Sequence, residues 1–549
     1  MKKTLFLLMA GVLLLVLLLS ACAQQTPTPT AKPTATTTAP ATTKPAPTTT
    51  VPATTTKPAT PSTGPGGQKY GGTLIVITPS TPLAFGVPAL LGLDAGSIGA
   101  AIPAIQTLVN NDNSGKTTGT LAESWKIDVA NKTITFSLRK GIKFHDGTDF
   151  NAQAAKWNMD QVLAKKISQT AQWNSVDIVD DYTVRVNLKT YQNTALTNFE
   201  SSAGMMISPT AFQKNGEEWA KINPVGTGAF KLKNFQRDVS LEYEKNTDYW
   251  EKGKPYLNGL KFQFIKDAVT ARMAFQAKQG DVVTNQTEDA IQELKKAGFK
   301  TESRIGAAMV LIPDSTHKDS PFANIKVRQA VALAIDRDTI CDRIGFGTWD
   351  PMNQPAAKTH FGQINITGKT YDPLKARQLL AEAGYPNGFT TTITTSSTFT
   401  QNTVQALQAY LDEVKITVKL DVVTFAKWNE MVYAGWNNSL MYVTQGATDT
   451  NYCSFLDRYY SAAATRYPVL KKPDGLTAQI TDMLNETEYD KYVALSQKAV
   501  KILVDDMTVI HIYVGNATNV LQTYVNDTSF NSLSGSGFRW YPENAWLNK

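Results

Sequence analysis

Three polar side chains in one short segment, Arg139, His145 and Asp146, have types that occur in catalytic sites. A histidine can act as a general base because its pKa lies close to neutral pH. Here the three residues follow an alternating strand pattern and enter a turn, in which Gly141 and Gly147 supply the turn conformations. Buried polar side chains in such segments are normally hydrogen-bonded rather than reactive. We therefore interpret His145 as a structural residue.

Other reactive patterns are incomplete. Gly226-Thr-Gly228 begins like a phosphate loop but lacks the further Gly and Lys, so it predicts the tight start of a hairpin over 230–243. The chain contains neither Gly-x-Ser-x-Gly nor His-Glu-x-x-His, and we expect no enzymatic activity. A surface hydrolase stays open as an alternative, because the paired carboxylates of a glycosidase meet only in space.

Histidines and cysteines give no metal pattern. His317, His360 and His511 are scattered without metal-ligand spacing, so we expect neither a metal nor a cofactor. Cys341 and Cys453 are far apart in sequence, which favours two separate buried thiols, although a disulfide between them stays open.

The first residues have the order of a secretory signal peptide. Lys2 and Lys3 precede an apolar run over 5–19, and small residues follow it. The alternative is an uncleaved membrane anchor, since roughly 20 apolar residues span a bilayer. Leu19-Ser-Ala-Cys22 resembles the lipobox of bacterial lipoproteins, which implies a lipid on Cys22. Both interpretations place the rest of the chain at the extracytoplasmic face of the cell membrane.

Residues 23–67 form a segment of different composition, in which 27 of 45 positions are Thr or Pro and none is acidic. Such a segment buries too little apolar surface to offset its chain entropy. It predicts an extended, disordered stalk, and its composition is also typical of O-glycosylated spacers.

The remaining 482 residues are too many for one hydrophobic core and predict at least two large lobes. The first 67 residues contribute five of the 54 basic side chains and no acid, which leaves 49 basic against 47 acidic residues in the body. A nearly neutral body without a clustered basic face argues against a nucleic-acid partner.

Alternating and helical patterns interleave along the body, which predicts an α/β fold. The elements that we expect are strands over 134–138, a hairpin over 176–188, a helical region over 322–344, a helix from Asp372-Pro373 to Gly384, and a helix over 404–414 followed directly by a strand over 416–422.

Several sequence blocks in order resemble the family 5 extracellular solute-binding proteins, the group that contains oligopeptide-, dipeptide- and nickel-binding proteins of ABC importers. The blocks are Leu121-Ala-Glu-Ser-Trp125, Phe136 to Gly147, Asn223-Pro-Val-Gly-Thr-Gly-Ala-Phe230, Asn246-Thr-Asp-Tyr-Trp250, Val327-Arg-Gln-Ala330 with Ala334-Ile-Asp-Arg337, and Tyr371-Asp-Pro373 through Ala383-Gly-Tyr385. They cover roughly residues 70–520, so the resemblance extends over the whole body.

The resemblance implies a two-lobed periplasmic-binding-protein type II fold that closes on its ligand through two hinge segments. The first lobe would comprise 68–312, with an inserted subdomain over about 112–223, and the C-terminal segment 508–549 would return to it. The second lobe would comprise 313–507. The implied protein is a monomer that delivers a small solute to an ABC permease.

The resemblance also suggests where a ligand would bind. In the peptide-binding relatives, an Asp after the strand near residue 440 pairs with the ammonium of the peptide. Here Thr448 stands at the expected position and Asp449 is one place away. Trp349 and Tyr513 lie where relatives contribute residues to the cleft.

An oligosaccharide is the alternative ligand. Sugar sites stack ring faces on aromatic side chains and satisfy hydroxyl groups with amides. Trp436, Tyr442, Gln445 and Asn451 suit that chemistry. The choice between a peptide and a sugar stays open at this point.

Overall fold

The computed structural model describes residues 64, 66–91, 95–112, 114–366, 371–446, 452–530 and 540–549. The chain divides into two units, 1–59 and 60–549, and every element named below belongs to the second unit. The predicted signal peptide, Cys22 and nearly all of the predicted stalk lie outside the described residues. None of the helices within the described ranges is long and apolar enough to cross a membrane.

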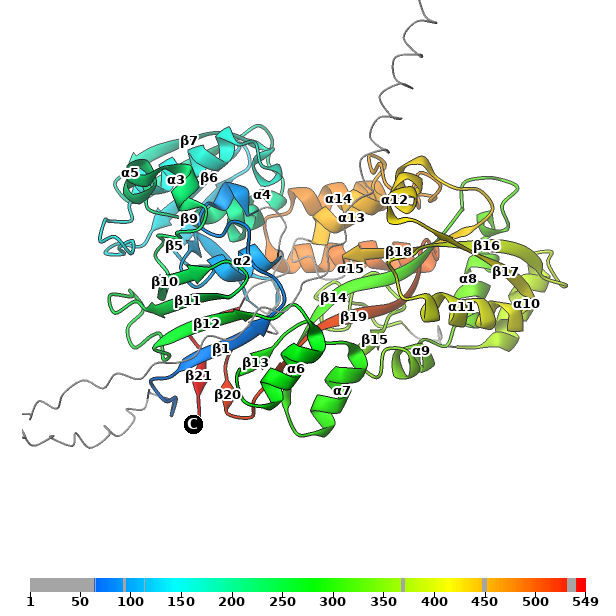
Figure 1. Ribbon diagram of the computed structural model, residues 1–549. Coiled ribbons are helices and arrows are strands. Elements are labelled where there is room, and N and C mark those ends of the chain that lie inside the picture. The colour runs from blue at the N-terminus through cyan, green and yellow to red at the C-terminus, as the bar shows by residue number, and fades with distance from the viewer. Residues whose placement is uncertain are drawn as a thin grey trace, which may run out of the picture. The chain divides into compact units, whose positions relative to one another are not determined.

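A mixed sheet is the main framework, and within the described residues it has eleven strands. In spatial order the strands are β10 (Phe230–Gln236), β11 (Ser240–Lys245), β12 (Gly259–Phe264), β1 (Thr73–Thr78), β13 (Val282–Val283), β19 (Ile510–Leu521), β14 (Lys300–Pro313), β18 (Leu440–Gly446), β16 (Phe389–Ser396) and β17 (Ile416–Val423), and β15 (Trp349–Pro351) pairs with β19 (Figure 1).

The sheet has two parallel groups of strands separated by an antiparallel middle, and the strands β10 and β11 extend one edge antiparallel. Strand β1 runs parallel to β12 and β13, and β16 runs parallel to β17 and β18. The long strands β14 and β19 pair antiparallel between the two groups. Parallel strands need crossover connections. In sequence, α6 (Ala268–Gln276) lies between β12 and β13, α11 (Gln401–Glu413) between β16 and β17, and α12 (Phe425–Ala434) between β17 and β18. The predicted α/β class is confirmed.

The helices of the described residues are α2 (Ala95–Ala101), α3 (Ala152–Ala164), α4 (Thr194–Thr197), α5 (Pro209–Ala220), α6 (Ala268–Gln276), α7 (Glu288–Lys296), α8 (Ile325–Ala334), α9 (Arg337–Arg343), α10 (Pro373–Glu382), α11 (Gln401–Glu413), α12 (Phe425–Ala434), α13 (Tyr452–Tyr460), α14 (Leu476–Asn485) and α15 (Tyr489–Asp505).

A second, antiparallel sheet lies within the predicted insertion, whose limits stay a prediction. Its strands are β5 (Ala122–Asp128), β6 (Thr133–Leu138), β8 (Thr183–Leu188) and β7 (Trp173–Asp180). The predicted hairpin over 176–188 is confirmed, and Asp180 accepts a hydrogen bond from the backbone of Tyr182 in its turn. Residues of β6 alternate between partly and fully buried, as their apolar pattern predicts.

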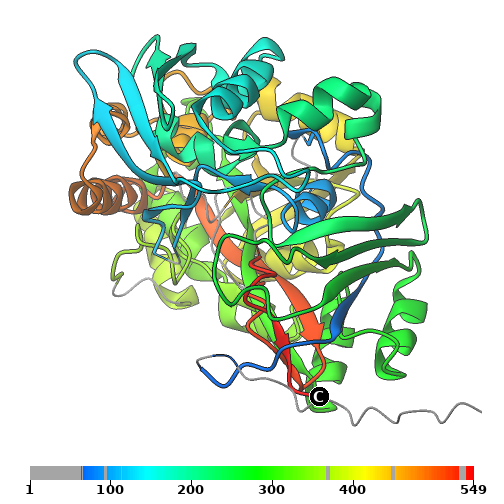
Figure 2. The same ribbon diagram turned by 90° about the vertical axis from the view of Figure 1, so that its left-hand side faces the viewer.

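The C-terminal end of the chain lies beside the beginning of β1 (Figure 2). Leu547 of β21 (Trp546–Leu547) belongs to the same hydrophobic cluster as Leu74 of β1. Strand β21 pairs with β20 (Val525–Asn526), and two further short pairs join β2 (Gln106–Thr107) to β9 (Met205–Met206) and β3 (Val109–Asn111) to β4 (Thr117–Gly119).

The helical region predicted over 322–344 is broken into two helices, α8 and α9. Ile335 adopts an extended conformation, and Asp336 caps α9 by accepting from the backbone of Thr339. The next predicted helix, α10, begins as expected, with Asp372 accepting from the backbone of Lys375. It ends before Gly384, which has a φ of 93°.

The residues with reactive side-chain types take part in packing. His145 Nε2 lies 2.9 Å from the carbonyl oxygen of Gly228, and burial lowers the pKa of His145 to about 4. A Cβ at Gly226 would lie 2.1 Å from the carbonyl oxygen of Ala104, so this glycine permits a close backbone approach. The predicted structural role of the segment fits these contacts.

The two cysteines of the body are buried as separate thiols. Cys341 packs in the cluster around α8 and α11, whereas Cys453 packs in the cluster around α13 and α15. Across the described ranges, no group of three His, Cys, Asp or Glu side chains is arranged to hold a metal ion.

Candidate functional site

The predicted ligand-binding residues of β18 point to opposite faces of the sheet. Successive side chains alternate along a strand, so Tyr442 and Gln445, three positions apart, face opposite sides. Tyr442 packs in the hydrophobic cluster that contains α8 and α11. Gln445 hydrogen-bonds to Tyr460, which belongs to the cluster around α13 and α15. The predicted residues therefore form two groups rather than one.

The first group contains Trp349, Tyr442 and Tyr513. The rings of Trp349 and Tyr513 stack with centroids 4.0 Å apart and planes 2° apart. This stack results from the pairing of β15 with β19, which sets Pro351 opposite Tyr513. The hydroxyl groups of Tyr442 and Tyr513 lie 3.1 Å apart. Burial raises the pKa of both tyrosines, so both stay neutral and hydrogen-bonding.

Trp349 also connects this group to helix α7. Its indole N–H donates to the carboxylate of Glu288, at 3.3 Å. Trp349 and Tyr513 are 8% and 4% exposed, so a ligand could reach no more than an edge of either ring in this conformation. Their role in ligand binding stays a prediction. In this structure the two side chains pack β15, β19 and α7 together.

The second group surrounds Gln445, and we call Trp436, Gln445, Tyr452, Tyr460 and Tyr467 the Gln445 cluster. Tyr460 donates a hydrogen bond of 2.7 Å to Oε1 of Gln445. The rings of Trp436 and Tyr467 meet edge to face at 6.3 Å. All five side chains are buried.

Nε1 of Trp436 and the hydroxyl oxygen of Tyr452 have no hydrogen-bond partner among the described residues. Nε2 of Gln445 and the hydroxyl oxygen of Tyr467 make no hydrogen bond of good geometry there, although these two side chains lie close enough to interact with each other. A buried donor or acceptor without a partner costs about 1–3 kcal/mol. Native structures contain few such groups, so their concentration in this cluster makes it the candidate for a polar ligand site among the predicted residues.

The remaining predicted residues, Thr448, Asp449 and Asn451, lie outside the described residues. In sequence they come between Gln445 and Tyr452 of the Gln445 cluster. The role of Asp449 as an ammonium partner stays a prediction.

A cavity of about 490 Å³ lies between two segments far apart in sequence, 115–197 and 487–492. Aromatic side chains from both segments line it, as do Lys116, Glu488, Asp490 and Lys491. Beside it, the amide of Asn193 donates from Nδ2 to the carbonyl oxygen of Glu486 at 2.6 Å. Its volume lies in the usual range for small-molecule sites.

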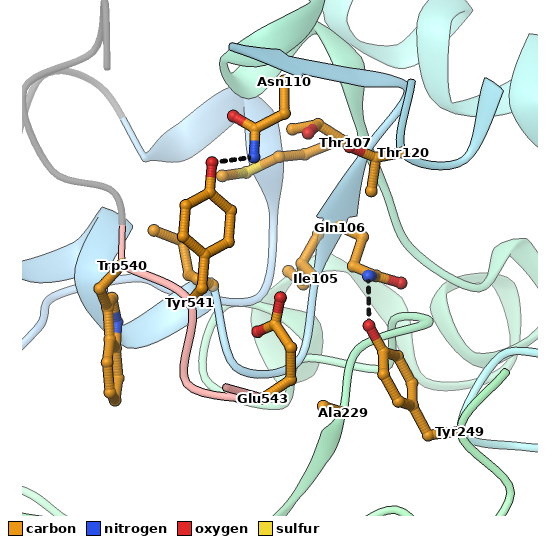
Figure 3. Close-up of a pocket in the computed structure, with 12 residues that line it drawn as sticks. Ile105, Gln106, Thr107, Asn110, Thr120, Ala229, Tyr249, Trp540, Tyr541 and Glu543 are labelled. Atoms are coloured by element: carbon orange, nitrogen blue, oxygen red, sulfur yellow. Dashed lines mark hydrogen bonds between the residues drawn. The ribbon is translucent and has the colours of Figure 1, made fainter. Parts of the chain in front are cut away.

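A smaller pocket of about 50 Å³ lies against β2 and β3 (Figure 3). Two hydrogen bonds frame it, from Gln106 to the hydroxyl of Tyr249 at 2.9 Å and from Asn110 to the hydroxyl of Tyr541 at 2.5 Å. The carboxylate of Glu543 points into the space between these two pairs. Burial raises the pKa of Glu543 to about 7, and the negative charge of Glu251 acts in the same direction.

Sequence reasoning missed several of these residues. Tyr460 and Tyr467 follow the segment 440–456 that carried the ligand prediction, and the dipeptide Tyr459-Tyr460 was a usable signal of an aromatic cluster. Glu543 gave no signal, because its pocket partners Gln106 and Asn110 are more than 400 positions away in sequence.

Comparison with known proteins gives a match to a family model. The model described as "Bacterial extracellular solute-binding proteins, family 5 Middle" matches residues 116–466. Among curated proteins, the glutathione-binding protein GsiB of Pectobacterium atrosepticum is 32% identical over 329 residues, which are 57% of this chain and 62% of that protein. The corresponding protein of Escherichia coli strain K12 is 30% identical over 331 residues, 57% of this chain and 63% of its own. The matches thus span less than two thirds of these relatives.

Solved structures match over more of the chain. The periplasmic binding protein DppA from Helicobacter pylori, in complex with the peptide STSA, is 25% identical with a TM-score of 0.65, and the match covers 87% of this chain and 99% of that one. HbpA2 from Haemophilus parasuis is 22% identical with a TM-score of 0.79, covering 87% and 100%. The murein tripeptide binding protein MppA in its unliganded open form is 19% identical with a TM-score of 0.77, covering 86% and 97%. The last two matches concern the fold alone.

Proposed function

The chain belongs to the bacterial extracellular solute-binding proteins of family 5, and from this premise we propose that it captures a peptide-type solute and delivers it to an ABC permease. The predicted family and the predicted type II periplasmic-binding-protein fold are both confirmed. The relatives named above are solute-binding proteins and not enzymes.

The observation that carries this proposal is the set of buried polar atoms without hydrogen bonds of good geometry in the Gln445 cluster. An amide N–H of Gln445 and the indole N–H of Trp436 are donors, and the hydroxyl groups of Tyr452 and Tyr467 can both donate and accept. The backbone of a bound peptide offers carbonyl oxygens and N–H groups in alternation, which would satisfy such a mixed set. Binding would then recover part of the cost of the unpaired groups.

The names of the relatives support a peptide as the solute class. GsiB is a glutathione-binding protein, and the DppA structure contains a peptide. We propose that Asp449 pairs with the ammonium group of the solute, because a buried ammonium without a carboxylate would be costly. Trp349, Tyr442 and Tyr513 lie on the other face of the sheet, and we propose that they support the site by packing β15, β18 and β19 together rather than by contacting the solute.

We further propose that the solute is enclosed by closure of two lobes, 68–312 with 508–549 and 313–507. The hydrogen bonds of Asn193 to Leu484 and Glu486 join segments of the two proposed lobes. The backbone N–H of Asn193 donates to the carbonyl oxygen of Leu484 at 2.6 Å. Contacts that form only on closure let a ligand stabilise the closed state through its differential affinity.

We also propose that the protein is held at the extracytoplasmic face of the cell membrane. A lipid on Cys22 would hold the protein at the membrane, and the Thr/Pro-rich stalk would give the body reach. Tethering raises the local concentration of the body near its permease.

The experiment is calorimetric titration of the body with glutathione and with a set of di- and tripeptides. We expect binding that weakens at least tenfold in Gln445→Leu, because the substitution leaves a solute group unpaired. We expect a loss of similar size in Asp449→Ala. The matched control is Gln378→Leu, which replaces an exposed glutamine on α10 and should leave the affinity unchanged.

Three results would contradict the proposal. Peptide affinity that is unchanged in both variants would remove the Gln445 cluster and Asp449 from the site. Binding of oligosaccharides in place of peptides, with loss in Trp436→Ala, would replace the solute class. Labelled oligosaccharide that is returned cleaved would instead indicate a hydrolase.

A further inference from the structure

A cavity of about 150 Å³ lies apart from the Gln445 cluster, between α8, α10, the segment after β15 and the start of β19. Half of the lining residues are apolar, and the polar ones are Gln329, Arg337, Asn353 and His511. Leu333 and Leu379 form part of its wall and are partly exposed, as are Gln329 and Asn353. The cavity therefore opens to solvent.

Arg337 is held in one fixed orientation. Its Nε donates to the carbonyl oxygens of Met352 and His511, at 3.1 and 2.7 Å. Its Nη1 donates to the carbonyl oxygens of Ala332 and Ile335, at 2.8 and 3.2 Å. These four bonds come from backbone atoms on both sides of the guanidinium, so the group is positioned before any ligand arrives.

The guanidinium of Arg337 forms no ion pair with an acidic side chain of the described residues, and no hydrogen bond joins its Nη2 to any of them. The neighbouring carboxylates of Asp338 and Asp336 act on it only through their charge, and Asp336 is hydrogen-bonded to the backbone and side chain of Thr339. Burial lowers the pKa of Arg337 to about 10, so the group stays charged at neutral pH.

A second group in the same wall has an unused polar atom. His511 is 4% exposed, and its Nε2 is buried without a hydrogen-bond partner in the described part of the chain. Burial and the charge of Arg337 together lower the pKa of His511 to about 3. The ring is therefore neutral at physiological pH and adds no second positive charge.

We propose that this cavity is a binding site for a small organic carboxylate with a short apolar tail. The carboxylate contacts Nη2 of Arg337 through a charge-assisted hydrogen bond, with the amides of Gln329 and Asn353 as further donors within the lining. The tail packs against Leu333, Leu379 and the other apolar wall residues. A carboxylate suits the site better than an inorganic anion, because an all-polar ion would leave the apolar wall without a partner.

The test is calorimetric titration of the purified protein with acetate, butyrate and butyramide. We expect butyrate to bind at least tenfold more tightly than acetate, since each buried methylene contributes about 0.8 kcal/mol. Butyramide has the same shape without the charge and should bind at least tenfold more weakly than butyrate.

Variants separate this site from the solute site. Arg337→Gln should lose butyrate binding, and Leu379→Trp, which fills the cavity from its rim without touching the guanidinium, should do the same. The Leu379 variant covers the case in which Arg337→Gln does not fold. Gln445→Leu should bind butyrate normally, because no residue of the Gln445 cluster lines this cavity.

Four outcomes would overturn the inference. One is absence of butyrate binding to the wild-type protein, and another is equal binding of butyrate and butyramide. The third is butyrate binding that is unchanged in Leu379→Trp. Binding of phosphate in place of all carboxylates would reject the ligand class.

Discussion

We predict that the stability of the protein depends on pH through Glu543, which lines the pocket in Figure 3. Its carboxylate lies between the Gln106–Tyr249 and Asn110–Tyr541 pairs, and no cation is hydrogen-bonded to it among the described residues. Burial is the main cause that raises its pKa from 4.5 to about 7, and the charge of Glu251 adds to the rise. The folded protein thus holds a proton on Glu543 over a pH range in which the unfolded chain has released it.

Proton linkage gives the sign and the size of the change in the free energy of unfolding with pH. Between pH 4.5 and pH 7 the folded state binds more protons, so the free energy of unfolding falls as the pH rises through this window. One pKa unit corresponds to about 1.4 kcal/mol, so the rise from 4.5 to about 7 is worth about 3 kcal/mol. The side chain keeps partial contact with solvent, which screens the ionised form, and we therefore expect about 2 kcal/mol.

Glu543→Gln removes this cost because the amide is neutral at every pH. We expect the variant and the wild type to be equally stable at pH 4, and the variant to be more stable by about 2 kcal/mol at pH 8. Urea unfolding followed by circular dichroism at several pH values measures the difference. Glu244→Gln, at an exposed position of β11, is the matched control and should show no such trend. A difference that does not change between pH 4 and pH 8 would refute the reasoning.

Three further substitutions test contacts that hold the fold, each by urea unfolding at neutral pH. Arg328→Met should cost about 3 kcal/mol, because it removes the hydrogen bonds of the buried guanidinium to four backbone carbonyl groups together with its ion pair to Asp506 at 3.0 Å, and a loss below about 1 kcal/mol would contradict this. Gly226→Ala should cost more than about 3 kcal/mol, since its Cβ would lie 2.1 Å from the carbonyl oxygen of Ala104, and near-wild-type stability would show that the backbone relaxes freely. Asp372→Ala should cost about 1 kcal/mol through loss of the helix cap, and Asp372→Asn should restore most of it.

Local patterns predicted individual elements well, because the interactions that form them lie within a few residues. The hairpin over 176–188 and the capped start of α10 both depend on neighbours in sequence. The break between α8 and α9 escaped prediction for a physical reason. Both helices pack on the same hydrophobic cluster, so the apolar spacing continues through the extended residue Ile335. The capping residue Asp336 was the one local signal of the break.

The residues of the candidate site are brought together by contacts between segments far apart in the sequence. Only some of these contacts could be predicted from the sequence. The spacing of Tyr442 and Gln445 within one strand already predicts opposite faces. The stack of Trp349 on Tyr513 depends on the pairing of β15 with β19, which joins segments more than 150 positions apart. No period or composition rule predicts such a pairing.

The blocks that carry the family resemblance and the polar atoms of the Gln445 cluster proposed to bind the solute are different residues. Gly226 permits a close backbone approach, and Arg328 and Arg337 bond backbone carbonyl groups, so these block residues hold the fold. The unpaired polar atoms of the Gln445 cluster lie outside the blocks. Substitutions in the blocks should therefore change stability more than solute preference, whereas Gln445→Leu should change solute affinity at little cost in stability. A protein can in this way keep its fold and its family signature while its solute changes.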